Sequence, residues 1–131
     1  MLFLLLKYCS YSFILFLTYI LFVFGVKEIE KYEKENNVHD APETSIDEVI
    51  GMFFTVILSY PLLNINNNTI LSIQLVILLI LFRIFDILKP GIINFIDKKI
   101  NNSFGVIADD IIAGFYSAMI FTFFSALFFN N

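Results

Sequence analysis

Long apolar stretches alternate with short polar segments along the chain, and four of the stretches are long enough to form helices. They cover residues 1–26, 46–63, 69–88 and 106–129. The third follows an asparagine-rich turn and stops before Pro90, which a helix does not continue through. Because about 20 apolar residues cross a bilayer core of ~30 Å, the pattern predicts an all-α fold. We expect a small polytopic helical membrane protein with three to four long apolar helices and a short interfacial helix.

The first apolar stretch is interrupted by the polar segment KYCSYS at residues 7–12. At about 1.5 Å per residue, residues 13–26 reach only about two-thirds of a bilayer core. We therefore expect Met1–Leu6 to form the tail of one helix and Phe13 to begin the next. No small-residue cleavage site follows the apolar run, which argues against a secretory signal peptide.

Three further features predict how the helices end and pack. The charged segment KEIEKYEKE should extend a helix into solvent, since Glu30 and Lys34 have the spacing of a helical ion pair. The segment GIINFIDKKI separates isoleucines from charges, which predicts the short helix in the membrane interface. In the last stretch, Gly114 and Ala118 are small residues four apart and would allow close helix packing.

Composition supports the membrane interpretation. Of the 131 residues, 59% are hydrophobic, whereas soluble domains average about 45–50%; a compact soluble helical protein is the alternative. The length predicts a single domain, residues 1–131. The net charge of −4 argues against a nucleic-acid partner, because no basic stripe is present to neutralise phosphates. Cys9 is the single cysteine, which excludes an intrachain disulfide.

The basic residues predict the topology. Seven of the eight Lys and Arg lie in residues 27–34 and 83–99, and none lies in the turn at 64–68 or near the C-terminus. The positive-inside rule therefore places segments 27–49 and 83–105 together on the cytoplasmic side.

Carboxylates gather at this predicted cytoplasmic level. Five of them stand at the ends of apolar stretches: Asp47, Glu48, Asp86, Asp109 and Asp110. The basic groups at the same level are Arg83, Lys89 and His39. Poorly solvated negative charge is costly unless it is paired or ligated. Oxygen donors with an acidic excess suit a hard divalent cation, and Mg²⁺ is the usual one when a phosphate substrate completes its shell.

These residues also have simple structural explanations, although helix capping explains only one of the two acids Asp47 and Glu48. Glu48 can close a capping box at its helix start, and Asp109–Asp110 can be first-turn acids at the positive end of a helix. Arg83 can pair with Asp86 three residues further on, and Lys89 can extend to the interface. The histidine can be an ordinary loop residue. Their convergence at one depth nevertheless predicts a site.

Absent motifs narrow the chemistry of such a site. The chain has no GxxxxGK phosphate loop, no HExxH helix and no GxSxG elbow. With Mg²⁺, one arginine and one lysine, the fitting chemistry is hydrolysis or transfer of a phosphoryl group. The competing hypothesis is a non-enzymatic, cation-binding membrane protein. A transporter would need ionisable groups near the membrane midplane, where the apolar stretches contain only Gln74 and a few hydroxyls.

Three ordered motifs resemble those of a known family. VHDAPETSIDEVIGM (38–52), FRIFDILKPGIINFID (82–97) and FGVIADDIIAGFYSA (104–118) are similar to the HD…DExxGM, FRxFDxxKPxPI…D and GxGxxxDDxxAG motifs of the phosphatidylglycerophosphatase A family. The resemblance implies a helical, Mg²⁺-dependent lipid phosphatase of the bacterial inner membrane, which converts phosphatidylglycerophosphate into phosphatidylglycerol. The polar motif positions carried over are His39, Asp40, Asp47, Glu48, Arg83, Asp86, Lys89, Asp97, Asp109 and Asp110.

The chain departs from the family pattern in two places. Ile93 stands where the second proline of KPxPI would fall, and we expect little effect from it. The family's N-terminal motif GxxPxxPGTxGS is missing, and LFLLLKY resembles the tail of the helix that follows it. We expect the true start to lie upstream of Met1; the alternative is a truncated, inactive member.

The expected roles follow from the resemblance together with the chemistry of the side chains. The five carboxylates Asp47, Glu48, Asp86, Asp109 and Asp110 would be the Mg²⁺ ligands. Arg83 would bind the substrate phosphate with two parallel hydrogen bonds, and Lys89 would act on it as a point charge. A water activated by the metal or by a carboxylate would attack phosphorus, with His39 or a neighbouring acid such as Asp40 handling protons. A covalent aspartyl-phosphate is the other route.

Overall fold

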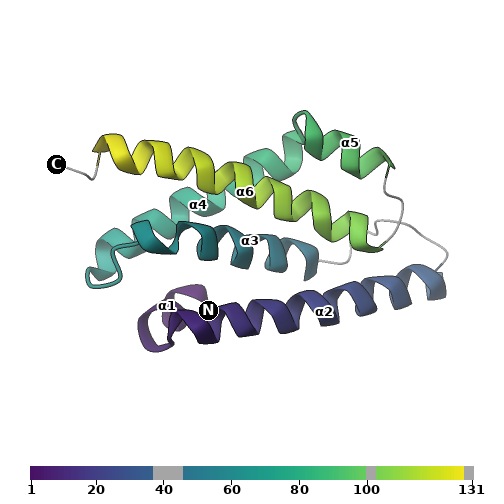
Figure 1. Cartoon of the computed structure of the whole chain (residues 1–131), viewed down its shortest axis with the longest axis horizontal. Coiled ribbons are helices and arrows are strands. Elements are labelled where there is room, and N and C mark those ends of the chain that lie inside the picture. The colour runs from purple at the N-terminus through teal and green to yellow at the C-terminus, as the bar shows by residue number, and fades with distance from the viewer. Residues whose placement is uncertain (37–45, 100–102, 129–131) are drawn as a thin grey trace.

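The computed structural model describes residues 1–36, 46–99 and 103–128, and all regular structure in these ranges is helical (Figure 1). The elements in chain order are α1 (Leu2–Tyr8), α2 (Tyr11–Asn36), α3 (Ile46–Ser59), the 3₁₀ turn η1 (Tyr60–Leu62), α4 (Asn68–Leu88), α5 (Ile92–Lys99) and α6 (Ser103–Phe128). The predicted all-α fold is confirmed.

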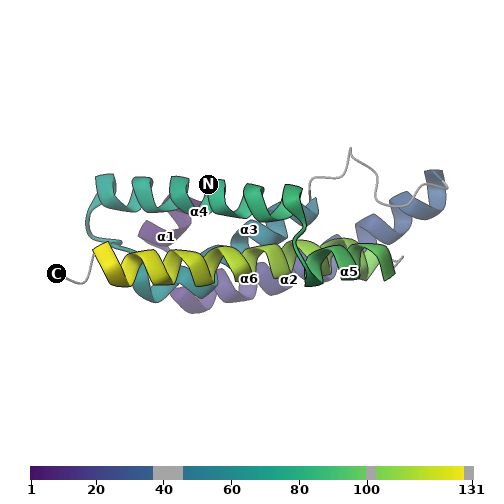
Figure 2. The same cartoon turned by 90° about the horizontal axis from the view of Figure 1, so that it is seen from above.

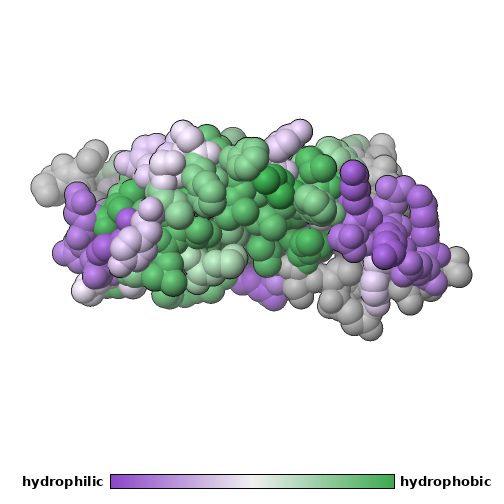
Figure 3. Space-filling view, turned by 90° about the horizontal axis from the view of Figure 1, so that it is seen from below, coloured by the Kyte–Doolittle hydropathy of each residue, from purple (hydrophilic) through white to green (hydrophobic). Residues whose placement is uncertain are grey.

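Three helices are long and apolar enough to cross a membrane: Tyr11–Tyr32 in α2, Asn68–Leu88 in α4 and Phe104–Leu127 in α6. Large apolar side chains cover their outer surfaces, and Figure 3 shows a hydrophobic band between hydrophilic ends. Such a band suits lipid contact, because monomeric soluble proteins rarely expose large contiguous apolar patches. The structure therefore supports the membrane interpretation over the compact soluble alternative.

The break in the first apolar stretch is confirmed. Helix α1 ends where Cys9 adopts an extended backbone with φ −111° and ψ 151°. Helix α2 begins two residues later, and the Phe13 N–H donates to the Ser10 hydroxyl oxygen at 3.3 Å. A serine that accepts from the N–H three residues on stabilises a helix start. The turn between the two helices is thus short, residues 9–10, and lies within the polar segment at 7–12.

Helix α3 is the centre of the bundle and is too short to span a bilayer core by itself. Its 14 residues extend about 21 Å at 1.5 Å per residue. It lies between α2 and α6 in Figure 1 and also contacts α4, which lies beside α6 in Figure 2. A helix that is apolar on most of its surface is stable when other helices surround it. Pro61 lies in the 3₁₀ turn that ends it.

Gln74, the polar residue within the apolar α4 stretch, has a structural role. Its side-chain N–H donates to the Leu62 carbonyl at 3.0 Å, and its side-chain oxygen accepts from the Asn64 N–H at 2.8 Å. Asn67 then caps α4 by accepting from the N–H groups of Thr69 and Ile70. The predicted polar turn at 64–68 is therefore held by its own side chains and by Gln74.

The charged ends of α2, α3 and α4 lie at one end of the bundle, together with α5 and the first part of α6. There Figure 1 shows the C-terminal end of α2, the start of α3, the end of α4, α5 and the start of α6. The turn before α4 and the end of α6 lie at the opposite end. The predicted grouping of charged segments is confirmed, and it gathers the candidate residues at a single end.

Candidate active site

Arg83 joins two helices at the charged end. Its Nη1 atom lies 2.5 Å from a carboxylate oxygen of Glu48 on α3 and 3.1 Å from Oδ2 of Asp86 on its own helix. The expected pairing with Asp86 is confirmed, and the contact with Glu48 adds a partner from α3. Because its side chain is still 43% exposed, the guanidinium keeps donors available for an anion.

Lys89 turns inward instead of extending to the interface. It ends α4 in the left-handed conformation, with φ 41° and ψ 57°, and its N–H donates to the Phe85 carbonyl. Its Nζ atom lies 2.6 Å from Oδ2 of Asp109 on α6. A lysine in this conformation costs about 1–2 kcal/mol, and such strain is typical of residues held for function. The backbone of Lys89 thus directs its ammonium group to the buried acids.

Asp109 and Asp110 lie deeper in α6 than expected. Helix α6 begins at Ser103 and has no acid in its first turn, so the explanation as first-turn acids is wrong. Both carboxylates are buried, with residue exposures of 5% and 3%. The Asp110 N–H donates to Oδ1 of Asp109 at 3.0 Å. Buried acids away from the helix terminus lack the stabilisation that a helix dipole gives near its end.

Two further acids complete the cluster around Asp110. The carboxylates of Asp86, Asp109 and Asp47 all lie close enough to Asp110 to repel its charge. Asp47 comes from α3 and is also buried, with 8% of its surface exposed. Helices α3, α4 and α6 thus bring the five predicted carboxylates and the two predicted cations to one end of the bundle. Asp97 lies in α5, but its side chain, like residues His39 and Asp40, is outside the described structure.

Gly51 is a residue of this region to which we assigned no role from the sequence. A Cβ atom there would lie 2.8 Å from the Phe82 ring and 3.0 Å from the Cβ atom of Asp110. Glycine therefore lets α3 approach α4 and α6 at the level of the acids. A glycine inside an apolar helix is the signal that points to such a close approach.

The donor set fits a magnesium ion in its chemistry. Within the described ranges, no three carboxylates are already arranged to enclose a metal. Mg²⁺ does not need such a cage, because it usually binds one or two carboxylates and fills its shell with waters and substrate phosphate. All donors here are oxygens, and the two cations form ion pairs with three of the five carboxylates, namely Glu48, Asp86 and Asp109. The expected Mg²⁺ site stays a prediction that this donor set supports.

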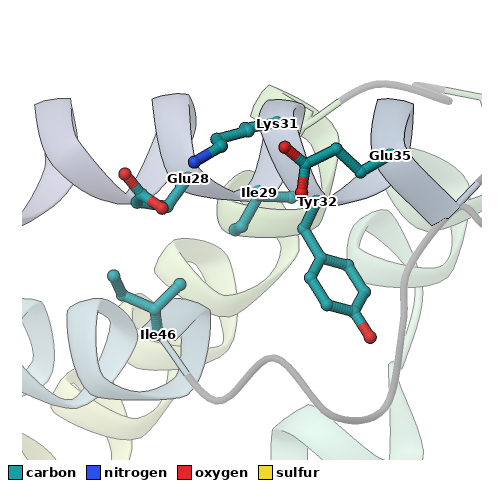
Figure 4. Close-up of a pocket in the computed structure, with 6 residues that line it drawn as sticks. All are labelled: Glu28, Ile29, Lys31, Tyr32, Glu35 and Ile46. Carbon is teal, nitrogen blue, oxygen red and sulfur yellow. The ribbon is translucent and has the colours of Figure 1, made fainter.

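The charged extension of α2 is separate from the acidic cluster. Lys34 and Glu30 form an exposed ion pair at 2.5 Å, as expected for a solvated helix. Beside it, a pocket of about 350 Å³ lies between α2 and the start of α3, where Figure 4 shows Ile29 and Ile46 facing each other across the pocket. Its charged groups Glu28, Lys31 and Glu35 all come from α2, and we assign it no chemistry.

The strained backbone of Lys89 gives a prediction about stability. Lys89→Gly and Lys89→Ala both remove the contact with Asp109, but only alanine keeps the cost of a positive φ. We expect the glycine variant to be more stable by about 1 kcal/mol, measured as the free energy of unfolding in detergent micelles. Equal stabilities would contradict the left-handed backbone at this position.

Comparisons with known proteins agree with these observations. The family model described as phosphatidylglycerophosphatase A matches residues 1–125. The chain is similar to a Haemophilus influenzae protein named phosphatidylglycerophosphatase A, with 33% identity over 106 residues, which is 81% of this chain and 60% of the relative. An Escherichia coli K12 protein of the same name is 34% identical over 99 residues, or 76% of this chain and 53% of the relative. The chain thus spans less than two-thirds of the length of either relative, and no solved structure matches it.

Proposed function

Because the chain belongs to the phosphatidylglycerophosphatase A family, we propose that it hydrolyses the terminal phosphomonoester of phosphatidylglycerophosphate. The products are inorganic phosphate and phosphatidylglycerol. The observation that supports this most is the cluster of Asp47, Asp86, Asp109 and Asp110 with Arg83 and Lys89. It lies toward the charged ends of α4 and α6, two of the three candidate membrane spans, where a lipid headgroup can reach it while the acyl chains stay in the bilayer.

The two cations are suited to bind the phosphate. The guanidinium of Arg83 presents forked donors that match two phosphate oxygens, and the ammonium of Lys89 adds a compact positive charge. Both side chains are held by carboxylates in the described structure, through Glu48, Asp86 and Asp109. Preset donors stabilise developing charge without reorganising during the reaction. This arrangement orients the headgroup with its phosphorus toward the buried acids.

Hydrolysis then needs a water molecule and a proton acceptor. The water attacks phosphorus in line with the glycerol oxygen, and the bond between phosphorus and that oxygen breaks. A carboxylate of the cluster accepts the proton from the water, and the glycerol oxygen takes up a proton as it leaves. The excess of buried carboxylates supports this role, because acids in poorly solvated sites are better proton acceptors than acids in water.

Magnesium is part of the proposal. Asp47, Asp86, Asp109 and Asp110, together with Glu48, are the residues that would hold it. When bound, the ion supplies positive charge that neutralises the phosphate oxygens and lowers the barrier to attack. It would also offset the mutual repulsion of the carboxylates around Asp110.

We place the site on the cytoplasmic face of a bacterial inner membrane. The bacterial relatives support a bacterial membrane, and the distribution of positive charge supports a site that faces the cytoplasm. Lys27, Lys31 and Lys34 follow the apolar part of α2, and Arg83 and Lys89 lie at the same end of the bundle. The opposite end has Lys7 on the short α1. The positive-inside rule assigns the richer end to the cytoplasm.

Metal removal tests the proposal. The purified chain in phospholipid vesicles that contain phosphatidylglycerophosphate should release phosphate with Mg²⁺ present. EDTA should reduce release to background, and excess Mg²⁺ should restore it. Ca²⁺ should restore it poorly, because it prefers longer bonds and more ligands. Vesicles of phosphatidylglycerol, which has no phosphomonoester, are the control and should release none. Release that is indifferent to EDTA would refute the metal site, and no release with Mg²⁺ would refute the activity of this chain.

A further inference from the structure

An apolar groove runs along the outer face of the bundle and ends at the candidate site. It has a volume of about 450 Å³ and lies between α3 and α4, with the first residues of α1 as a further wall. Leu75, Val76, Leu79 and Phe82 line it from α4, and Met52 lines it from α3. These α4 residues are spaced three and four apart or adjacent, so they share one side of the helix. The groove therefore follows α4 along the membrane-spanning direction.

The groove has a charged end. Glu48 and Arg83 line it together with the apolar residues, and their side chains pair at 2.5 Å. Leu75 and Arg83 are eight positions apart on α4, which corresponds to about 12 Å along a helix. One continuous surface thus leads from the apolar middle of α4 to the guanidinium that we assign to the substrate phosphate.

A second apolar groove lacks the charged end that the groove between α3 and α4 has. It has a volume of about 300 Å³ and lies between α2, α3 and α6, where Leu15, Phe22, Phe54 and Ile57 are among its lining residues. All its lining residues are apolar or hydroxyl-bearing, and none is charged. Any acyl chain in the bilayer can lie against such a surface. Of these two grooves, the one between α3 and α4 combines an apolar length with a cation, which distinguishes an anionic lipid from a neutral one.

We propose that the groove between α3 and α4 holds one acyl chain of the lipid whose phosphomonoester is bound at Arg83. The inference rests on the proposed function, and it adds that the lipid reaches the site along the groove between α3 and α4. Lipid tails are as apolar as the groove, so burial there gives little affinity in a membrane. The shape of the groove orients the chain, and the charge complementarity between Arg83 and a phosphomonoester of about −1.5 to −2 selects the lipid.

Photochemical labelling tests this without relying on catalysis. The probes are phosphatidic acid, which has a phosphomonoester, and phosphatidylcholine, which has none, each with a diazirine in the middle of one acyl chain. Peptide mapping of the labelled chain should find phosphatidic acid at Met52, Leu75 and Leu79. Phosphatidylcholine should label them at least about threefold less, and Arg83→Gln should abolish this difference. Equal labelling by both lipids in the wild-type chain would mean that only bulk lipid touches the groove, which would overturn the proposal.

Two neighbouring residues of α4 give a matched pair of variants. Leu79 lines the groove and is 46% exposed, whereas Ile80 is 54% exposed and lies outside it. Leu79→Trp should fill the groove and reduce labelling by phosphatidic acid about tenfold. Apolar pockets discriminate by a factor of about this size between ligands that fit and ligands that do not. Ile80→Trp should leave labelling unchanged. Equal effects of the two substitutions would overturn the proposal.

Kinetics separate this inference from the proposed function. Leu79→Trp should raise KM for phosphatidylglycerophosphate about tenfold and leave kcat unchanged. It should also leave unchanged the hydrolysis of the same headgroup without acyl chains. Selective labelling without any phosphate release would support the groove and refute the activity. Phosphate release without selective labelling would support the activity and overturn the proposed acyl-chain site. A dimer in native mass spectrometry, with groove residues that neither lipid labels, would also overturn the acyl-chain site.

Discussion

Asp109→Asn is expected to reduce phosphate release from phosphatidylglycerophosphate by about 10³-fold, the usual scale for loss of one preorganised electrostatic contact in an active site. Asp109 is buried and holds the ammonium group of Lys89 at 2.6 Å. Asparagine removes the negative charge that positions Lys89 and that would hold a metal ion. Steady-state release of phosphate from vesicles measures the effect, with kcat and KM determined separately.

The fold should survive this substitution. The side-chain oxygen of asparagine can still accept from the Asp110 N–H, as Oδ1 of Asp109 does at 3.0 Å, so thermal unfolding in micelles should change little. Glu35→Gln is the matched control, because Glu35 is an exposed acid on the charged extension of α2. It should keep wild-type activity. Asp109→Asn activity within about threefold of wild type would contradict an active site at this end of the bundle.

Gly114→Leu is expected to have the largest effect on folding. Helix α6 crosses α3 closely at this glycine, where a Cβ atom would lie 2.6 Å from Oγ1 of Thr55 and 2.9 Å from the Gly51 carbonyl oxygen. The carbonyl belongs to the backbone and cannot move away without displacing α3. Overpacking of this kind costs about 3 kcal/mol. We expect a lower free energy of unfolding and loss of the monodisperse species in size-exclusion chromatography.

Phe115 provides the control for this substitution. It is the next residue on α6, and its side chain is exposed on the outer surface of the bundle. Phe115→Leu introduces the same side chain and should unfold within about 0.5 kcal/mol of wild type, as surface substitutions usually do. Equal stability of the two leucine variants would mean that α3 and α6 do not approach at Gly114.

The helices could be predicted from the sequence because their signals are local. Pro90 and the polar segment at 7–12 mark helix ends, and the predicted bounds agree with the structure within a few residues. The start of α6 was the main error, since NNSFG resembles a loop, yet the helix already begins at Ser103. That shift of three residues moved Asp109 and Asp110 out of the first turn. Helix starts are hard to predict when tertiary packing overrides local preference.

The residues of the candidate site and the local pair of Arg83 with Asp86 could also be predicted, but the partners on other helices could not. The contacts that define it join residues far apart in the sequence, as in the pairs of Glu48 with Arg83 and of Lys89 with Asp109. The periodicity of a chain does not specify which helix ends meet. The left-handed backbone conformation of Lys89 could not be predicted either, because lysine rarely adopts this conformation. The roles expected for His39 and Asp40 stay predictions outside the described residues.

The structure gives no support to transport as the alternative function. Gln74 is used to hold the turn before α4. The hydroxyls of Thr55 and Ser117 donate to carbonyls of their own helices, at 2.8 and 2.7 Å. These polar groups are satisfied within the bundle and do not form a path for ions. In the described ranges, the buried acids are Asp47 in the first turn of α3 and Asp109 and Asp110 in the first third of α6. Both helices begin at the charged end of the bundle (Figure 1).

The isotope content of the released phosphate tests the central claim most directly. The purified wild-type chain is incubated with Mg²⁺ and phosphatidylglycerophosphate vesicles in water enriched in ¹⁸O, and both products are analysed by mass spectrometry. Because water attacks phosphorus and the bond to the glycerol oxygen breaks, the phosphate should gain a single ¹⁸O atom and the phosphatidylglycerol should gain none. Label in the phosphatidylglycerol, or no phosphate above the level of empty vesicles, would contradict hydrolysis of the phosphomonoester by this chain.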